Sequence, residues 1–297
     1  MPSRRQIREA VVQFLYCADL EGGADPASLR EPFWQFITES DRRALLQATW
    51  KTLHHLSLGR EARLKEFQER VPLTLATLKA RPDLERTAMV LQNIADHENK
   101  WSVAMIELSR IPRDGDDDTF SERFEPVLAG LFRIDRDLDA ARKRFLNALD
   151  DIPGLRAQME PVAGSIRRLA RISERIRMIE EPEKFPDQVD LAKLRESKES
   201  IAALRRETDS LVAAVQREKE GIDERLAAVV ENFSPERIDP VDRAILRLAT
   251  WEILHSPEVP APVAIDEAIE LAKRFGTTDS GRFVNGILDK IAKQAAS

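Results

Sequence analysis

Residues 237–254, which read RIDPVDRAILRLATWEIL, contain the clearest fold signal in the chain. Asp239 can cap a helix whose first residue is Pro240, because an N-cap carboxylate accepts from free amides and proline suits the first turn. Apolar residues then recur every three or four positions, at Ala244, Ile245, Leu248, Trp251 and Leu254. The stretch therefore predicts an amphipathic helix that buries one face against a core.

Other segments near both ends of the chain show the same pattern. Ser3 and Gln6 can form a capping box at the start of a helix that we expect to reach Leu20. Spacings of three and four also predict helices over residues 41–55, 60–71, 263–276 and 279–293. Alternating strand patterns are scarce, so we expect an all-α fold.

The middle of the sequence has longer apolar runs at helical spacing. They occupy residues 120–149, 155–179 and 191–226, and their sustained repeat is typical of coiled coils. Short breaks containing Pro or Gly at 152–154 and 181–187 separate the runs, and short connections make neighbouring helices antiparallel. We therefore expect an antiparallel helical bundle or coiled-coil arm in this region.

Composition limits the classes of function. The 297 residues are 33% charged with a net charge of −6, which excludes a generic polyanion binder and leaves nucleic-acid contact to a local patch. Cys17 is the single cysteine, so we expect no disulfide framework or cysteine-based zinc site. The sequence shows no membrane span, signal-peptide pattern or catalytic motif. We expect a cytoplasmic protein with no catalytic residue, cofactor, metal site or membrane contact.

The two ends of the sequence resemble the NusB family of transcription antitermination factors. The likeness near the carboxyl terminus is carried by residues 237–254, by VAIDEAIELAKRFG at 263–276 and by RFVNGILDK at 282–290. Near the amino terminus it is carried by SRRQIREAVVQFLY at 3–16. The resemblance implies that residues 1–70 and 221–297 form a NusB-like pair of small helical bundles. Residues 71–220 would then be an inserted long-helix domain.

The resemblance also implies a non-catalytic, RNA-binding function. NusB proteins bind boxA-type RNA of ribosomal transcripts together with the ribosomal protein NusE, and act with RNA polymerase in the antitermination complex. A second hypothesis keeps the fold but makes the protein an interaction scaffold, in which the coiled-coil arm has the main role and RNA binding is weakened or lost. Apolar stripes on the arm would also allow a homodimer.

Three arginines, Arg4, Arg5 and Arg8, occupy the first two turns of the first expected helix. Positive charge there opposes the helix dipole at a cost of about 0.3–1 kcal/mol each, so helix stability does not explain it. Arginines beside the free amides of a helix start suit RNA phosphates, and a solvated terminus is the alternative. Gln6 stands where the family often has another basic residue, which thins the patch.

Four further residues complete the expected RNA surface. Tyr16 is either a core residue or a platform for a stacked base. Phe283 matches a family position near RNA, although its spacing also suits core packing. Asp279 can cap the last helix, together with Ser280, or accept a hydrogen bond from a base, and Arg282 can contact a phosphate.

The resemblance places the NusE-binding surface at the start of the carboxyl-terminal block, at Glu236, Arg237, Asp242 and Arg243. Acidic side chains there would complement a basic ribosomal protein. They would equally well cap the helix that follows, so the sequence leaves both interpretations open.

Overall fold

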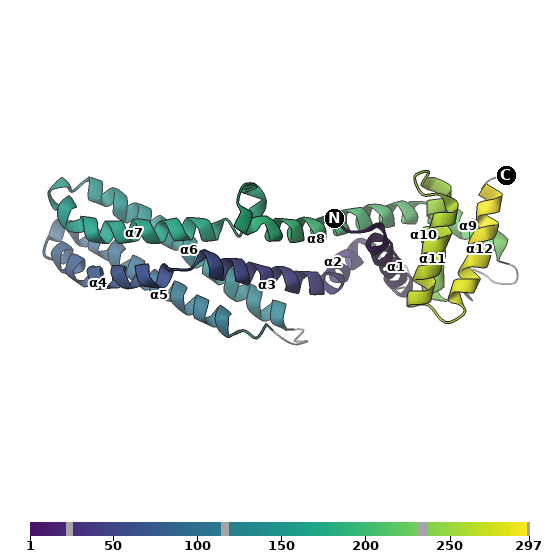
Figure 1. Cartoon of the computed structure of the whole chain (residues 1–297), viewed down its shortest axis with the longest axis horizontal. Coiled ribbons are helices and arrows are strands. Elements are labelled where there is room, and N and C mark those ends of the chain that lie inside the picture. The colour runs from purple at the N-terminus through teal and green to yellow at the C-terminus, as the bar shows by residue number, and fades with distance from the viewer. Residues whose placement is uncertain (22–25, 114–118, 231–236, 296–297) are drawn as a thin grey trace. The chain divides into compact units, whose positions relative to one another are not determined.

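The computed structural model describes residues 1–21, 26–113, 119–230 and 237–295. Every regular element in these ranges is a helix, which confirms the all-α fold (Figure 1). The chain divides into two compact units: unit 1 comprises Met1–Glu39 and Lys198–Ser297, and unit 2 comprises Ser40–Ser197. None of the helices in the described ranges is long and apolar enough to span a bilayer.

Unit 1 is assembled around α10 (Pro240–His255). Four helices pack against α10, namely α1 (Arg4–Leu20), α9 (Lys219–Val229), α11 (Ala261–Phe275) and α12 (Ser280–Ala295). Of the stripe expected from the sequence, Ala244, Ile245 and Leu248 are buried, and Leu246 and Ala249 are buried beside them. Because α10 is apolar on more than one side, it forms the centre of this unit.

The helix α2 (Pro26–Ile37) and the end of α8 (Ala192–Arg217) complete unit 1. Trp34 Nε1 donates a hydrogen bond to Asp209 Oδ1 at 2.9 Å, which connects the two helices. The Phe14 and Phe33 rings meet edge to face with centroids 5.0 Å apart, which connects α2 to α1. The sequence patterns did not predict α2, which contains Pro32.

Two helix starts in unit 1 form as the sequence predicts. Ser3 Oγ accepts from the Gln6 backbone N–H at 3.2 Å, and Gln6 Oε1 accepts from the Ser3 backbone N–H at 2.8 Å. Asp239 Oδ1 accepts from the Val241 backbone N–H at 2.9 Å at the start of α10. The capping box and the aspartate cap therefore satisfy amides that have no partner within the helices.

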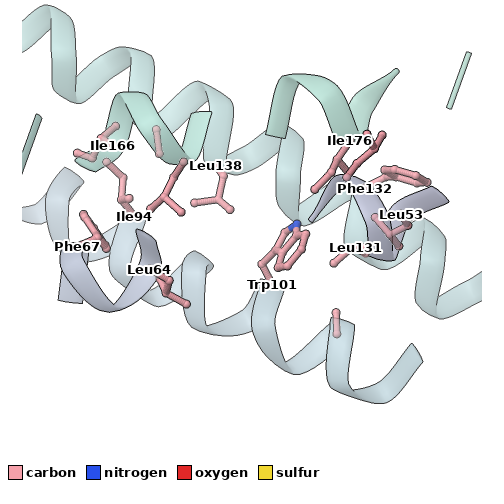
Figure 2. Close-up of a cluster of buried hydrophobic side chains, with 14 of the residues drawn as sticks. Leu53, Leu64, Phe67, Ile94, Trp101, Leu131, Phe132, Leu138, Ile166 and Ile176 are labelled. Atoms are coloured by element: carbon pink, nitrogen blue, oxygen red, sulfur yellow. The ribbon is translucent and has the colours of Figure 1, made fainter. Parts of the chain in front are cut away.

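Unit 2 contains a four-helix bundle, with α3 (Glu39–Leu56) packed into the same core. Its helices are α4 (Arg60–Lys79), α5 (Glu85–Arg110), α6 (Phe120–Asp150) and α7 (Arg156–Arg177). Both α4 and α6 pack against α5 and α7, so α5 and α7 occupy opposite corners. Figure 2 shows side chains from all four helices meeting in this core, among them Phe67, Ile94, Leu138 and Ile166. Short 3-10 turns lie at Pro82–Leu84 (η1), Pro153–Leu155 (η2), Pro182–Lys184 (η3) and Val189–Leu191 (η4).

A buried ionic cluster joins the four helices of this bundle. Glu98 on α5 is fully buried and accepts hydrogen bonds from Arg60 at 2.5 Å and from Arg142. Arg142 Nη1 also donates to Ser173 Oγ at 2.8 Å, and the Arg60 guanidinium lies 3.5 Å from the centre of the Trp101 ring. Each buried charge therefore has an opposite charge or a polar partner, as burial requires.

The three apolar runs of the middle correspond to α6, to α7, and to α8 with α9. The structural units change near residues 40 and 198, whereas the family resemblance predicts divisions near 70 and 220. Leu53 and Phe67 belong to the core of unit 2, and Val212 and Val215 belong to the core of unit 1. Periodicity shows that a residue is buried but not which core receives it. The division into a family domain and an insertion stays a prediction.

Candidate nucleic-acid interface

The three arginines at the start of α1 have three different environments. Arg4 is exposed. Arg5 forms a two-pronged ion pair with Glu267 of α11, with Nη2 to Oε1 at 2.9 Å and Nε to Oε2 at 3.1 Å. Arg8 is 5% exposed and lies inside unit 1. Arg4 and Arg5 are therefore the members of this expected cluster that reach solvent.

Arg8 is paired with a carboxylate that is buried beside it. Its Nε donates to Glu252 Oε1 at 2.9 Å and Oε2 at 3.1 Å, and its Nη1 lies 3.8 Å from Glu267 Oε2. Burial raises the pKa of the Glu252 carboxyl, and the Arg8 charge opposes that rise. The pair joins α1 to α10, which gives Arg8 a structural role that the sequence analysis missed.

A cavity of about 330 Å³ lies beside the first two turns of α1. Arg4 and Arg8 contribute positive charge to its wall, but Glu207, Glu252 and Glu258 contribute negative charge. The rest of the wall is formed by Ile7, Ser210, Leu211, Ala214, Trp251, Ser256 and Val259. Because acids outnumber bases here, the wall does not favour a phosphate, and contact with RNA would have to use the outer surface.

The start of α12 presents the other expected RNA-binding residues. The side chains of Arg282 and Asp279 are 91% and 88% exposed, and their nearest charged atoms are 4.0 Å apart. Phe283 is exposed over 38% of its surface. A Cβ on Gly281 would lie within 4 Å of Ile269 and Lys273, so this end of α12 lies against α11. Arg5 also binds α11, through Glu267, so α11 has contacts with both expected parts of the RNA surface.

Ser280 joins the start of α12 to the start of α10. Its Oγ donates to Asp242 Oδ2 at 3.0 Å and accepts from the Thr277 backbone N–H at 2.9 Å. Burial raises the pKa of the Asp242 carboxyl, nearby Asp239 adds to the rise, and the Ser280 hydrogen bond opposes it. Asp242 is 6% exposed, so this expected partner-binding residue lies in the interior of unit 1.

The remaining predicted site residues differ in accessibility. Tyr16 is partly buried and packs against the core of unit 1, and Arg237 is exposed. Arg243 is half-buried, and its Nε donates to Asp19 Oδ2 at 2.5 Å. Glu236 lies outside the described residues.

An arginine–aspartate network that the sequence analysis missed holds α1 and α9 against α10. Arg247 donates to both carboxylate oxygens of Asp223 at 2.8 Å and to Asp19 Oδ1 at 3.0 Å. Burial opposes ionisation of Asp19, but hydrogen bonds from Arg247 and Arg243 outweigh it and lower its pKa. The sequence contains one signal for this network, which is that Arg247 lies at helical spacing among apolar residues. Among the described residues, no group of three or more His, Cys, Asp or Glu side chains could hold a metal ion.

Comparison with known proteins finds similarity to the NusB family. The NusB family model matches residues 167–293. Transcription antitermination protein NusB of Pseudothermotoga lettingae is 53% identical over 75 residues, which are 25% of this chain and 54% of that protein. The corresponding protein of Sorangium cellulosum is 47% identical over 85 residues, which are 29% of this chain and 61% of that protein.

A solved structure of Thermotoga maritima NusB is 40% identical, covers 35% of this chain and 78% of the other chain, and has a TM-score of 0.31. The chain spans between about half and two thirds of the length of the curated relatives it matches. The family match begins within α7 and continues through α8 to α12, so it overlaps the end of the predicted insertion, 71–220. It does not include residues 1–70, where the likeness to the family stays a prediction.

Proposed function

We propose, from the premise that the carboxyl-terminal part of this chain belongs to the NusB family, that the protein acts in transcription antitermination as a non-catalytic RNA-binding factor. The observation that carries the proposal is the family match across α8 to α12, the region that presents Arg282 and Phe283 to solvent. Its ligand would be boxA-type RNA, bound together with NusE in the RNA polymerase antitermination complex.

The outer surface of unit 1 supplies suitable chemistry for RNA. Arg5 and Arg282 would contact phosphates, and Arg4 would add positive charge beside the start of α1. The exposed part of Phe283 would stack on a base, and the Asp279 carboxylate would accept from a base amino group. Tyr16 would contribute only its accessible edge.

Arg8 would act on this surface indirectly. Its pair with Glu252 fixes α1 against α10, and its second contact is with Glu267, the same carboxylate that holds Arg5. RNA phosphates would compete with Glu267 for Arg5, because Arg5 is half-exposed, whereas Arg8 would stay in place. This arrangement gives one solvent-accessible and one buried arginine on the same helix.

The NusE-binding surface would lie at the start of α10. Arg237 would contact the partner directly, and Glu236 belongs to the same proposed surface. Asp242 and Arg243 would fix the position of α10 beneath this surface, since their partners are Ser280 of α12 and Asp19 of α1. A basic partner would gain from acids near this surface mainly in association rate.

A charge-deletion experiment tests the RNA site. The full chain and the variant Arg5→Ala/Arg282→Ala are titrated against a fluorescent boxA-type RNA, in the presence of NusE, over a series of salt concentrations. Log affinity falls linearly with log salt concentration, and for a single strand each lost phosphate contact makes that slope shallower by about 0.7. We therefore expect the double variant to have a slope shallower by about 1.4 than that of the wild type.

The matched control is Arg206→Ala. Arg206 is 61% exposed on α8 of unit 1 and forms an ion pair with Glu199, so it resembles Arg5 in charge and setting. The control should bind as the wild type does. If the double variant also retained the wild-type slope, the proposed RNA surface would be wrong and the interaction scaffold would be the better account.

A further inference from the structure

Unit 2 has a group of arginines on α4 and on the adjoining outer surface of α7, two helices that pack together. We call this the α4–α7 arginine face and define it by Arg63, Arg70, Arg167, Arg168 and Arg171. All five side chains are exposed or half-exposed, with Arg63 and Arg167 at 47% and 45%. The face belongs to a unit that the proposed RNA site on unit 1 does not use.

The acids on this face are too few to neutralise it. Glu66 is shared by Arg63 at 2.8 Å, Arg168 at 3.1 Å and Arg70 at 3.9 Å. Arg167 pairs with Glu160 at 2.7 Å. Within the described residues Arg171 has no ion pair, and exposed Glu174 lies one turn from it on α7, so three carboxylates stand against five guanidinium groups. Farther out on α4, Glu69 lies four residues from Lys65, and these charges offset each other.

Several of these guanidinium groups are positioned by neutral atoms. Arg70 Nη1 donates to the Pro161 carbonyl at 3.0 Å and to Ser165 Oγ, and Arg168 Nη2 donates to the same Oγ at 3.3 Å. A neutral acceptor orients a guanidinium without cancelling its charge. Ion pairs that only hold α4 against α7 need one carboxylate for each arginine. Helix packing therefore does not explain why this face has more arginines than carboxylates.

We propose that the α4–α7 arginine face binds the phosphate backbone of RNA. The planar fork of arginine matches phosphate oxygens two at a time. Arg167 and Arg171 are one turn apart, about 6 Å along the helix axis, a separation of the same order as that of successive phosphates on a strand. Two arginines at this spacing can contact neighbouring phosphates of one strand. The choice of RNA as the polyanion rests on the proposed function. The excess of arginines over carboxylates on this face does not depend on that function.

The test removes charge from this face in the full chain. The variant Arg167→Gln/Arg171→Gln leaves the Glu66 contacts intact and keeps good helix formers. Binding of a fluorescent RNA that extends beyond the boxA element is measured over a series of salt concentrations. We expect the salt slope to fall by about 1.4, because two phosphate contacts are lost.

The matched control is Arg86→Gln/Arg110→Gln. Both residues are exposed on α5, at the opposite corner of the bundle from α7, and carry the same total charge. The control should keep the wild-type slope, and circular dichroism should show equal helix content for all variants. An unchanged slope for Arg167→Gln/Arg171→Gln would overturn the proposal, whatever the unit 1 variant does.

The outcomes separate this proposal from the proposed function. A reduced slope in Arg167→Gln/Arg171→Gln with a normal slope in Arg5→Ala/Arg282→Ala would support the α4–α7 face and contradict the unit 1 site. No RNA binding by the wild type would overturn both. Displacement of the RNA by polyglutamate at equal charge concentration would overturn the choice of RNA and point to an acidic protein.

Discussion

At the scale of single residues, the first turns of α1 show how neighbours in sequence take different roles. Arg5 and Arg8 are three positions apart, yet one pairs with Glu267 at the surface and the other with Glu252 in the interior. A buried ion pair that loses one partner leaves an uncompensated charge, whereas a surface pair leaves one that water can solvate. The two arginines should therefore respond very differently to substitution.

We expect Arg8→Ala to destabilise unit 1 by about 3–5 kcal/mol, because Glu252 would stay buried without its partner. Arg5→Ala is the control and should have a much smaller effect, because water can solvate the Glu267 carboxylate that it leaves. Urea unfolding followed by circular dichroism measures both. Equal effects of the two substitutions would show that the Arg8–Glu252 pair is not a buried pair in solution.

Asp242 should give unit 1 a pH-dependent stability. Its raised pKa means that the folded state binds more protons than the unfolded state at pH values between the ordinary and the raised pKa, so its contribution to stability is lost as pH rises through that range. Asp242→Asn keeps an oxygen that accepts from Ser280 and removes the charge. Its stability relative to the wild type should therefore increase with pH. Urea unfolding at several pH values checks this, and a relative stability that fell with pH would contradict it.

The sequence predicted which residue types gather at the candidate site but not their burial. Arg4, Arg5 and Arg8 form one cluster in sequence, and only contact with α10 shows that Arg8 is inside. Asp242 looked like a surface acid because its partner Ser280 is 38 residues away. Such pairs depend on tertiary contacts, which local patterns do not contain.

At the scale of helices, two glycines near the carboxyl terminus test how tightly α11 and α12 are joined. A Cβ on Gly276 would lie 2.5 Å from Ser280 Oγ and 2.8 Å from the Ala272 carbonyl oxygen. Ser280 cannot easily move, since it is buried and bonded to Asp242. Gly276 therefore permits a close approach that a larger residue would prevent.

We expect Gly276→Ala to destabilise unit 1 by about 1–3 kcal/mol through overpacking. Gly286→Ala is the matched control, because a Cβ there has no neighbour within 4 Å and the residue lies inside α12. The control should stabilise the protein by about 0.5–1 kcal/mol. Thermal unfolding of both variants is the measurement, and shifts of the same sign would contradict the expected difference.

Helix prediction succeeded where capping and periodicity agreed. The start of α1 and the start of α10 both carried a cap and an apolar stripe, and both form as expected. The helix α2 contains an internal proline and has a short apolar pattern, which local rules read poorly. The sequence could not predict which helices pack together, because periodicity identifies the buried face of a helix but not the helix that covers it.

At the scale of the whole molecule, each unit has a hydrophobic core of its own. The core of unit 2 includes α3 to α7, and the core of unit 1 includes α1, α2 and α9 to α12. Deleting residues 71–220 would remove Val212 and Val215 from unit 1 and would separate α3 from its core. The structural boundaries at 40 and 198 are therefore better places to divide the chain.

We expect residues 40–197 alone to fold as a helical bundle, because their buried residues contact one another. Circular dichroism and cooperative thermal unfolding of the fragment check this. A second fragment of residues 71–197, which lacks α3 and part of α4, should unfold at a lower temperature. A non-cooperative transition for 40–197 would show that unit 2 depends on the rest of the chain.

Composition concealed the charged surface that structure reveals. The chain has a net charge of −6, yet the α4–α7 arginine face collects five arginines around Glu66 and Glu160. Net charge is a sum over the whole surface of a molecule, so it does not show a local excess of positive charge on two packed helices. The family resemblance could be predicted from residues 237–290, whereas this face required the pairing of α4 with α7.

The most direct test of RNA binding in antitermination is one titration of wild-type protein. A fluorescent boxA-type RNA is titrated with the full chain, with and without NusE, at a low and a high salt concentration, and fluorescence anisotropy is measured. We predict binding that NusE strengthens and that salt weakens, as phosphate contacts require. Absence of binding at low salt with NusE present would contradict the proposed function.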